Sequence, residues 1–520
     1  MARIERTKNA TRNILFGAIL KIYQIAVPFF MRTAMIYFMG IQFLGLNSLF
    51  ASILSVLNLA ELGVGSAMVF SMYKPIANDD NTVICALMKL YKVYYRIIGG
   101  IIAVLGIILT PFVPHLIKGD VPQSINVYVL YHLNLAATVL SYWLFAYKNS
   151  ILQAHQRNDV VSKVTLITNT FQYGLQILVL WLLHNYYIYV IVALITQALT
   201  NIVTAFAANK LYPQFKAEGV VPQNDVKMIN KRIKDLFTSK IGAVVVNSAD
   251  TIVISAFLGL TVLAVYQNYF YILTSVIGFV TIIFSSCTAG IGNSLVVETK
   301  EKNFKDLNKF TFIISWIAGV CSCCFLNLFQ PFMEIWVGKD LMLNYAAVVC
   351  FVVYYFIYEI NQLLNLYKDA GGIWHEDRFR PLVTAVANLG LNLIMVRFWG
   401  IYGILLSTVI SMLLVGMPWL FHNLFTTLFE WKWLPHYLKK VLLYTAFSIG
   451  VSIISSLACY YINLGKWSTL FARLIVCFIV PNVSFFIIYH NTEEYIETLT
   501  LVNGMTKGKI AGLLRWLGMK

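Results

Sequence analysis

The chain has 520 residues, of which 59% are hydrophobic and only 12% carry a formal charge, and its net charge is +16. A water-soluble protein of this length would carry about 25% charged residues, so the composition excludes a sizeable soluble domain. It indicates a helical membrane protein, because apolar runs such as residues 97–117 are much longer than the alternating segments of about 10 residues that build a membrane β-barrel.

The basic N-terminus leads into an apolar segment from Ile14 to Met39. This segment is too long for the apolar region of a signal peptide, and no small-residue cleavage site follows it, so we interpret it as a retained transmembrane helix. Comparable apolar spans recur along the chain, and we expect about fourteen helices in all. Their approximate ranges are 13–39, 42–70, 83–116, 124–147, 160–183, 186–209, 234–258, 262–295, 308–331, 342–367, 380–397, 400–423, 438–462 and 468–489.

Lys and Arg are distributed unequally between the two sides of this arrangement. With the N-terminus inside, 28 of the 39 basic residues fall in inside segments and seven within predicted helices, and the outside loops hold only Lys118, Lys339, Arg397 and Lys466. Membrane proteins concentrate positive charge in their cytoplasmic loops. We therefore expect both termini to be cytoplasmic, and we attribute the positive charge to membrane orientation rather than to binding nucleic acid.

Eight cysteines lie almost entirely within the predicted helices. The run from Cys321 to Cys324 lacks the spaced second pair that a zinc site would need. We interpret these cysteines as apolar filling and predict no metal site.

The chain shows weak internal similarity. A shift of 219 residues aligns Lys21 with Lys240 and Gly40 with Gly259. The interval covers six predicted helices, and because six is even, the two halves would run the same way through the membrane as parallel repeats. The expected organisation is a cytoplasmic N-terminus (1–12), two six-helix bundles (13–210 and 234–423) joined by a cytoplasmic linker (211–233), helices 13 and 14 (424–490) and a cytoplasmic amphipathic tail (491–520).

Several motifs resemble those of bacterial polysaccharide flippases (the Wzx-type O-antigen flippases) of the multidrug/oligosaccharidyl-lipid/polysaccharide exporter superfamily. They appear in the expected order between about Asn13 and Asn423: Gly45-Leu46-Asn47-Ser48-Leu49-Phe50, Ile53-Leu54-Ser55, Ala60-Glu61-Leu62-Gly63, Leu152-Gln153-Ala154-His155-Gln156, Lys368-Asp369-Ala370-Gly371-Gly372 and Gly400-Ile401-Tyr402-Gly403.

The resemblance implies two six-helix bundles around a central cavity, with two further helices attached, in the bacterial inner membrane. It also implies movement of an undecaprenyl-diphosphate-linked oligosaccharide from the inner to the outer leaflet. Its partners would be that substrate, membrane lipid and polysaccharide polymerase machinery. The multidrug branch of the superfamily usually has twelve helices, so helices 13 and 14 favour the branch that handles lipid-linked sugars.

Helix 1 offers the clearest candidates for binding a diphosphate. Lys21, Gln24, Pro28 and Arg32 are spaced 3, 4 and 4 residues apart and share one helical face. A charge at the bilayer centre costs about 2.5–3.5 kcal/mol on insertion scales, so Arg32 well inside a span suggests a function. The alternatives are that Lys21 snorkels to the interface and that Arg32 pairs structurally with a carboxylate such as Glu61.

Helix 7 presents a polar face of Lys240, Asn247, Asp250 and Thr251. Asp250 could bind a coupling Na⁺ or proton, because hard cations prefer oxygen ligands, or it could be half of a buried ion pair. Glu61 on helix 2 is a similar candidate. We expect no cofactor other than such an ion.

Helix 10 places Tyr355, Tyr358, Gln362 and Asn365 on one side. These side chains suit the stacking and hydrogen bonding of sugars, although tyrosines near helix ends also anchor helices at the membrane surface.

Lys89, Lys92 and Arg96 share a face of helix 3. Because residues 97–117 alone can span the bilayer, we favour an interfacial position with snorkelling side chains, from which they could attract a headgroup.

Signatures of ATP hydrolysis and of common hydrolases are missing, so we predict a transporter rather than an enzyme. The preferred function is a flippase for a lipid-diphosphate-linked oligosaccharide. The alternatives are a Na⁺- or H⁺-coupled exporter of drugs or small molecules and, in another class, a membrane polysaccharide polymerase or glycosyltransferase.

Overall fold

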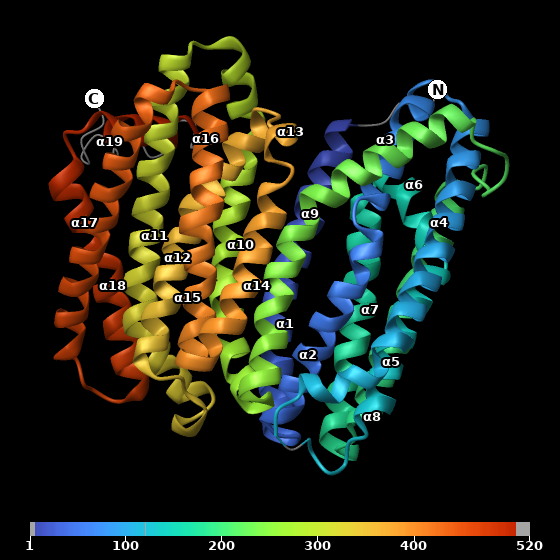
Figure 1. The fold of residues 1–520 in the computed structure, drawn as a ribbon, viewed down its shortest axis with the longest axis horizontal. Helices are drawn as coiled ribbons and strands as arrows, with labels where there is room; N and C mark the ends of the chain where they lie inside the picture. Colours follow the sequence, from blue (N-terminus) through green and yellow to red (C-terminus); the bar gives the residue numbers. More distant parts are fainter. Residues whose placement is uncertain (1–5, 120, 506–520) are drawn as a thin grey trace. The chain divides into compact units, whose positions relative to one another are not determined.

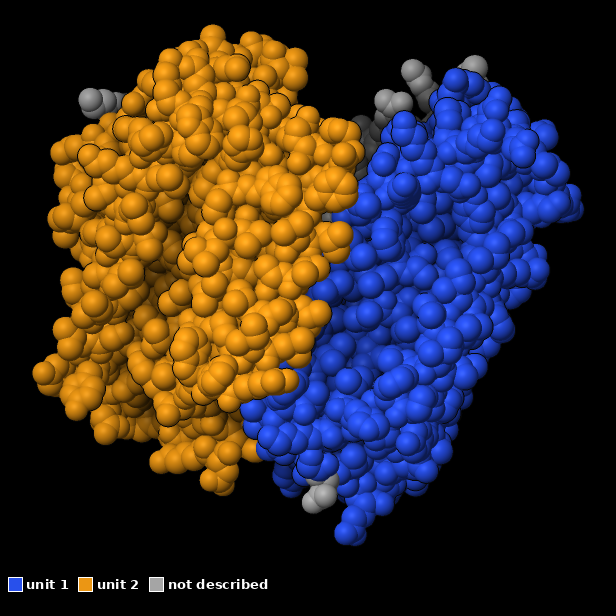
Figure 2. Space-filling view, in the orientation of Figure 1, with its two compact units in different colours: residues 1–264 blue, residues 265–520 orange. Residues whose placement is uncertain are grey.

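The protein is helical throughout the part that the structure describes. The computed structural model describes residues 6–119 and 121–505, apart from the side chains of residues 6–11, 14, 239, 240, 243, 247, 283, 285, 286, 289 and 505. The chain divides into two compact units, unit 1 (residues 1–264) and unit 2 (residues 265–520), coloured separately in Figure 2. Within each unit the long helices lie side by side (Figure 1).

The helices of unit 1 run from the N-terminus to the start of α10. They are α1 (Arg6–Phe38), α2 (Ile41–Leu57), α3 (Val64–Ala77), α4 (Asn81–Leu109), α5 (Val127–Trp143), α6 (Asn149–Ala154), α7 (Asn158–Leu178), α8 (Tyr186–Leu211) and α9 (Gln223–Leu258). The sequence assigned residues 234–258 to the second bundle, whereas the contacts of α9 group it with unit 1.

Unit 2 contains most of α10 and the remaining helices. They are α10 (Leu260–Val297), α11 (Lys300–Trp336), α12 (Tyr345–Ala370), α13 (Trp374–Asp377), α14 (Arg380–Trp399), α15 (Ile401–Ser411), α16 (Met417–Thr427), α17 (Leu434–Tyr460), α18 (Lys466–Tyr489) and α19 (Glu493–Met505).

The expected polytopic helical membrane protein is confirmed. In the described part of the chain, twelve helical stretches are long and apolar enough to cross a membrane. The number rises to thirteen if α5 and residues 146–154, which are bent by 48° relative to each other, count as one span. The remaining predicted range, 234–258, lies within α9, where the apolar stretch Val244–Leu258 is shorter.

The predicted continuous helix over 42–70 is broken in the structure. The chain forms a 3₁₀ turn over Asn58–Glu61, and Gly63 then adopts a left-handed conformation with φ 88° before α3 begins. A Cβ atom on Gly63 would lie 2.6 Å from the Cβ atom of Leu236 on α9. Glycine meets both demands, since it has no side chain and enters the left-handed region without strain.

Turns with positive φ recur at nearly constant intervals along the two halves of the chain. Gly40 donates to the carbonyls of Met35 and Ile36, and Gly259, 219 residues later, donates to the equivalent Ile254 and Ser255. Further pairs are Gly119 with Gly338, again 219 apart, and Gln156 with Gly372 and His184 with Gly400, each 216 apart. These intervals are close to the 219-residue shift seen in the sequence, and the internal repeat itself stays a prediction.

A buried carboxylate follows each turn of the Gln156–Gly372 pair. Asp159 accepts hydrogen bonds from Arg157 at 2.9 Å and from Lys163 at 3.2 Å. In unit 2, Arg380 donates to both oxygens of Asp377, at 2.5 and 2.8 Å. Each carboxylate thus lies beside the cations that neutralise it.

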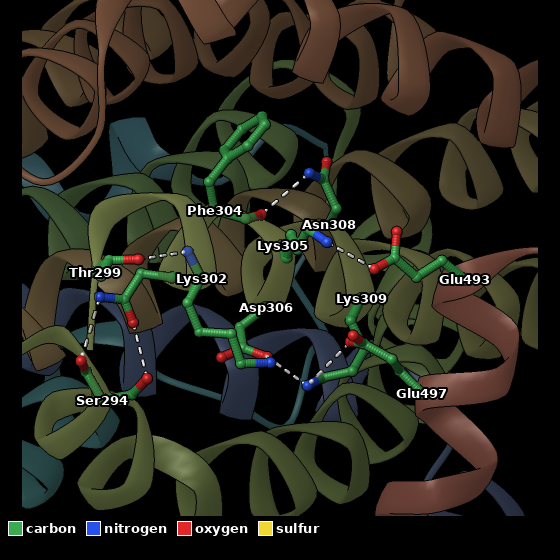
Figure 3. Close-up of polar contacts among 11 residues, drawn as sticks. Ser294, Thr299, Lys302, Phe304, Lys305, Asp306, Asn308, Lys309, Glu493 and Glu497 are labelled. Atoms are coloured by element: carbon green, nitrogen blue, oxygen red, sulfur yellow. Dashed lines mark hydrogen bonds and ion pairs between the residues drawn. The ribbon is translucent and has the colours of Figure 1, made fainter. Parts of the chain in front are cut away.

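The last described helix, α19, is attached to unit 2 by an apolar core and by ion pairs. Tyr495 and Leu499 are buried in a cluster with Phe312 of α11 and Phe485 of α18. Around this core, Lys305 binds Glu493 at 2.8 Å, and Lys309 contacts both Asp306 and Glu497 (Figure 3). The apolar residues Ile510 to Leu517 of the predicted amphipathic tail lie outside the described residues.

Candidate functional site

Unit 1 contains an open cavity of about 510 Å³ whose walls are rich in amide and hydroxyl groups. It is formed by α1, α2, α5, α7, α8 and the turn at Asn58. Its polar lining residues are Arg32, Asn47, Asn58, Asn134, Thr138, Ser141, Gln172, Tyr173, Gln176, Tyr189 and Gln197. Such groups match the hydroxyl-rich surface of a sugar.

Arg32 carries the formal charge of this cavity; the other described lining residues are neutral at pH 7. The side chain is partly buried on α1, close enough to Tyr189 to act on it electrostatically. The guanidinium group is always ionised and presents a planar set of donors that fits phosphate oxygens. The cavity therefore combines one permanent cation with walls rich in hydrogen-bonding groups.

The predicted stripe on helix 1 reaches the cavity only in part. Pro28 and Arg32 line it, whereas Lys21 and Gln24 are exposed and do not. The predicted counterpart of Lys21 on α9, Lys240, has its side chain outside the described residues. A role for Lys21, Gln24 and Lys240 in binding stays a prediction.

Glu61 lies at the break between α2 and α3, inside a cluster of tyrosines. Tyr95 donates to its Oε1 atom at 2.7 Å and Tyr142 to its Oε2 atom at 3.1 Å, while Tyr91 donates to the Tyr95 hydroxyl at 2.6 Å. Tyr142 also contacts Asn58, a lining residue of the cavity, at 3.2 Å. Glu61 is thus connected to the cavity wall through neutral hydrogen-bonding groups.

Sequence reasoning missed these tyrosines. Tyr91 and Tyr95 are four residues apart on α4, so they share one face of that helix. In the structure this face lies against Glu61, which belongs to the turn after α2. The i, i+4 spacing was visible in the sequence, but the partner on another helix was not.

Two of the other coupling-ion candidates lie on α9. Thr251 is buried and Asp250 is partly buried. Both make interactions with other groups. The side chain of Asn247 lies outside the described residues, so the proposed ion site on this helix stays a prediction.

The four candidates on helix 10 have different environments on α12. Tyr355 is fully buried with its ring edge-on to Phe325, and Tyr358 lies beside Tyr354. Gln362 donates to Thr281 at 2.5 Å, and Asn365 accepts a hydrogen bond from Arg380 at 2.7 Å. The contact of Asn365 belongs to the Asp377–Arg380 network, and sugar binding by these four residues stays a prediction.

Glu359 on α12 was not selected from the sequence as a site residue. Its side chain is completely buried, and neither carboxylate oxygen has a hydrogen-bond partner among the described residues. An isolated buried carboxylate is strongly disfavoured in its charged form, so this environment favours the neutral acid. This environment makes Glu359 a candidate binding site for a proton. The sequence alone does not reveal it.

A second cavity, of about 860 Å³, lies in unit 2 between α11, α12, α17 and α18. Its walls are mostly apolar, with Val349, Val353 and Ile453 among the residues that remain exposed. Arg473 is the charged group among its described lining residues and donates to the carbonyl of Ile462 at 3.2 Å. An apolar groove of this kind suits a hydrocarbon chain.

Comparison with solved structures relates this arrangement to known transporters. The lipid II flippase MurJ in an inward closed conformation matches with a TM-score of 0.68 at 14% sequence identity, over 92% of this chain and 99% of the other. An inward-facing multidrug resistance MATE family transporter of the MOP superfamily matches with a TM-score of 0.59 at 14% identity, over 78% and 97% of the two chains. A variant of the Vibrio cholerae MATE transporter VcmN matches with a TM-score of 0.51 at 14% identity, over 80% and 96%.

The fold is the one shared by MurJ and these MATE transporters. At this level of identity the likeness concerns the fold, and the sequence itself matches no protein-family model and no curated protein. The helical membrane-protein fold expected from the sequence is therefore confirmed.

Proposed function

We propose that the protein moves a lipid-linked oligosaccharide that carries phosphate, of the undecaprenyl-diphosphate type, from the inner to the outer leaflet of the bacterial cell membrane by alternating access. The observation that carries this proposal is the cavity of unit 1, where Arg32 lies among amide and hydroxyl groups. In this assignment Arg32 binds phosphate oxygens, and neighbours such as Asn47 and Gln197 hydrogen-bond to the sugars.

The character of the cavity distinguishes this proposal from the export of apolar drugs. A site for a drug-sized ligand is lined mainly by apolar and aromatic groups, with few polar ones. The walls of the unit 1 cavity instead carry amide side chains from α2, the turn at Asn58, α5, α7 and α8. The apolar cavity of unit 2 supports the lipid part of the proposal, since it offers a separate surface of the kind that a polyprenyl chain requires.

The driving force in this proposal is an ion gradient or the membrane potential. Glu61, Asp250 and Thr251 remain the proposed positions for a coupling Na⁺ or proton, and Glu359 joins them because of its burial. The flipped product would pass to polysaccharide polymerase machinery on the outer side.

The test is flipping in proteoliposomes that contain the purified protein and an undecaprenyl-diphosphate-linked oligosaccharide. A membrane-impermeant oxidant of sugars measures how much glycan reaches the opposite leaflet. Loss of one charge-assisted hydrogen bond is worth about 1.5–3 kcal/mol, so Arg32→Ala should slow flipping by about 10- to 100-fold. Arg32→Lys should retain part of the activity, because it keeps the charge without the planar donor set.

Arg397→Ala is the matched control, since Arg397 is an exposed arginine at the end of α14. Flipping at the normal rate by the Arg32→Ala variant would show that Arg32 does not bind the transported substrate. If the wild-type protein does not flip the lipid-linked oligosaccharide but takes up ethidium in a Na⁺- or H⁺-driven manner, the flippase proposal is overturned in favour of a small-molecule exporter.

A further inference from the structure

Three cations gather around Tyr147, on a part of unit 1 that does not line the cavity. Lys92 and Arg96 lie on α4, and Lys148 ends the short helix Ala146–Lys148. The Nζ atom of Lys92 lies 5.8 Å from the centre of the Tyr147 ring. The charge of Lys92 acts on Lys148 and the charge of Arg96 acts on the Tyr147 hydroxyl, so all three cations share one neighbourhood. We refer to Lys92, Arg96 and Lys148 as the Tyr147 cation cluster.

The cluster has no carboxylate partner among the residues that the structure describes. Lys148 donates instead to the neutral amide oxygen of Asn209. Neighbouring like charges repel one another, and the repulsion increases as the surroundings become less polar. The cluster therefore attracts an anion from outside the chain.

Several other cations of the protein show the contrast, because they pair with carboxylates of the same chain. These pairs are Arg157–Asp159, Lys163–Asp159, Arg380–Asp377, Lys309–Glu497 and Lys440–Glu494 (two of these residues, Lys309 and Glu497, are drawn in Figure 3). The Tyr147 cation cluster departs from this pattern.

The surface next to the cluster is apolar and exposed. On α4 the side chains of Val93, Ile97 and Ile101 are 43%, 54% and 44% exposed, and they continue from the cations along the helix. Trp143 is half exposed, and its Nε1 atom donates to the carbonyl of Arg96 at 3.2 Å. Tryptophan with basic residues beside an apolar helical face is typical of the boundary between hydrocarbon and headgroups.

We propose that the Tyr147 cation cluster binds the phosphate of an anionic phospholipid, whose acyl chains lie along Val93, Ile97 and Ile101 of α4. The occupant is a resident lipid and not the transported substrate, because no residue of α4 lines the unit 1 cavity. By the predicted orientation the lipid belongs to the cytoplasmic leaflet, where anionic headgroups attract basic side chains.

The experiment titrates the purified full-length protein in neutral detergent with dioleoyl phosphatidylglycerol or dioleoyl phosphatidylcholine and counts bound lipids by native mass spectrometry. The wild-type protein should retain one phosphatidylglycerol more tightly than any phosphatidylcholine. Each basic residue near an anionic surface is worth about 1 kcal/mol, so the double variant Lys92→Gln/Arg96→Gln should bind this lipid about fivefold more weakly per charge removed.

The double variant Lys227→Gln/Lys231→Gln is the matched control. It removes the same charge from exposed positions on α9, near Asn230, which accepts a hydrogen bond from Tyr94 of α4 at 2.7 Å. Unchanged lipid binding by this control supports the cluster as a defined site, whereas an equal loss in both variants overturns it in favour of general surface charge. A third condition adds 20-fold excess inorganic phosphate, and displacement of phosphatidylglycerol by phosphate alone would overturn the lipid assignment. Equal retention of the two lipids by the wild-type protein would also overturn it.

Discussion

Two carboxylates of unit 2 are equally inaccessible but have opposite surroundings. Glu359 has no hydrogen-bond partner for either oxygen within the described chain, whereas Asp377 is held by two donors of Arg380 and by Asn423 at 3.1 Å. Burial without partners favours the neutral acid, and burial beside a guanidinium favours the carboxylate. Replacement of the carboxyl group by its amide should therefore change the free energy of unfolding differently at the two positions.

We expect Glu359→Gln to change the free energy of unfolding by less than about 1 kcal/mol, because an amide replaces a neutral acid of nearly the same shape. Asp377→Asn should destabilise unit 2 by about 3–5 kcal/mol, because it leaves the charge of Arg380 buried and uncompensated. Thermal unfolding of the two purified variants, followed by size-exclusion fluorescence, measures both. A large loss for Glu359→Gln would mean that Glu359 is charged and bound to a cation.

Close helix packing depends on a few positions without a side chain. A Cβ atom on Gly45 of α2 would lie 2.3 Å from the backbone carbonyl oxygen of Leu260, where α10 begins. A backbone atom cannot move aside as a flexible side chain can, so the two helices would have to separate. Gly100 of α4, by contrast, has no heavy atom within 4 Å of its Cβ position.

Gly45→Ala should therefore lower the free energy of unfolding by about 1–3 kcal/mol, the usual effect of overpacking. Gly100→Ala should be neutral or slightly stabilising, because alanine favours a helix more than glycine does. Thermal melting of both variants tests the contrast. Equal melting temperatures would show that α2 and α10 approach less closely than the structure indicates.

The helices themselves were predictable from the sequence, because each membrane-spanning stretch must be apolar over about 20 residues. Interruptions within them were not. The break at Asn58–Glu61 and the bend after Trp143 leave the apolar content of the stretch nearly unchanged. The first of them coincides with a close approach between helices, that of Gly63 to Leu236 of α9.

For the candidate site, helical spacing places Lys21, Gln24, Pro28 and Arg32 on one face of α1, but it does not show how far the cavity extends along that face. Arg32 lies in the cavity while Lys21, on the same face, is exposed. Periodicity shows which residues share a face, and only the packing of α2, α5, α7 and α8 determines where that face borders a cavity.

At the scale of the whole molecule, the uneven distribution of basic residues predicts the orientation in the membrane. Lys227 should face the cytoplasm and Lys466 the outside, and both are exposed. Cysteines placed at these positions in intact cells provide the test. A membrane-impermeant maleimide should label Lys466→Cys directly and Lys227→Cys only after permeabilisation; the opposite pattern would invert the orientation.

The parent protein for this labelling needs little alteration. Cys323, Cys459 and Cys477 pack in one buried cluster, and Cys85 is partly buried. We expect these thiols to react slowly with an impermeant reagent, and the unsubstituted protein provides the background. Labelling of the parent at the rate of Lys466→Cys would require removal of its own cysteines first.

The two carboxylates that follow the paired turns have a consequence for how the chain is made. The partners of Asp159 lie two and four residues from it, and the main partner of Asp377 lies three residues from it. Contacts this close in sequence form quickly and do not wait for distant segments to be synthesised. Each of these carboxylates can therefore form its ion pair while the nascent chain is still leaving the ribosome. The insertion machinery then receives an ion pair rather than an isolated charge.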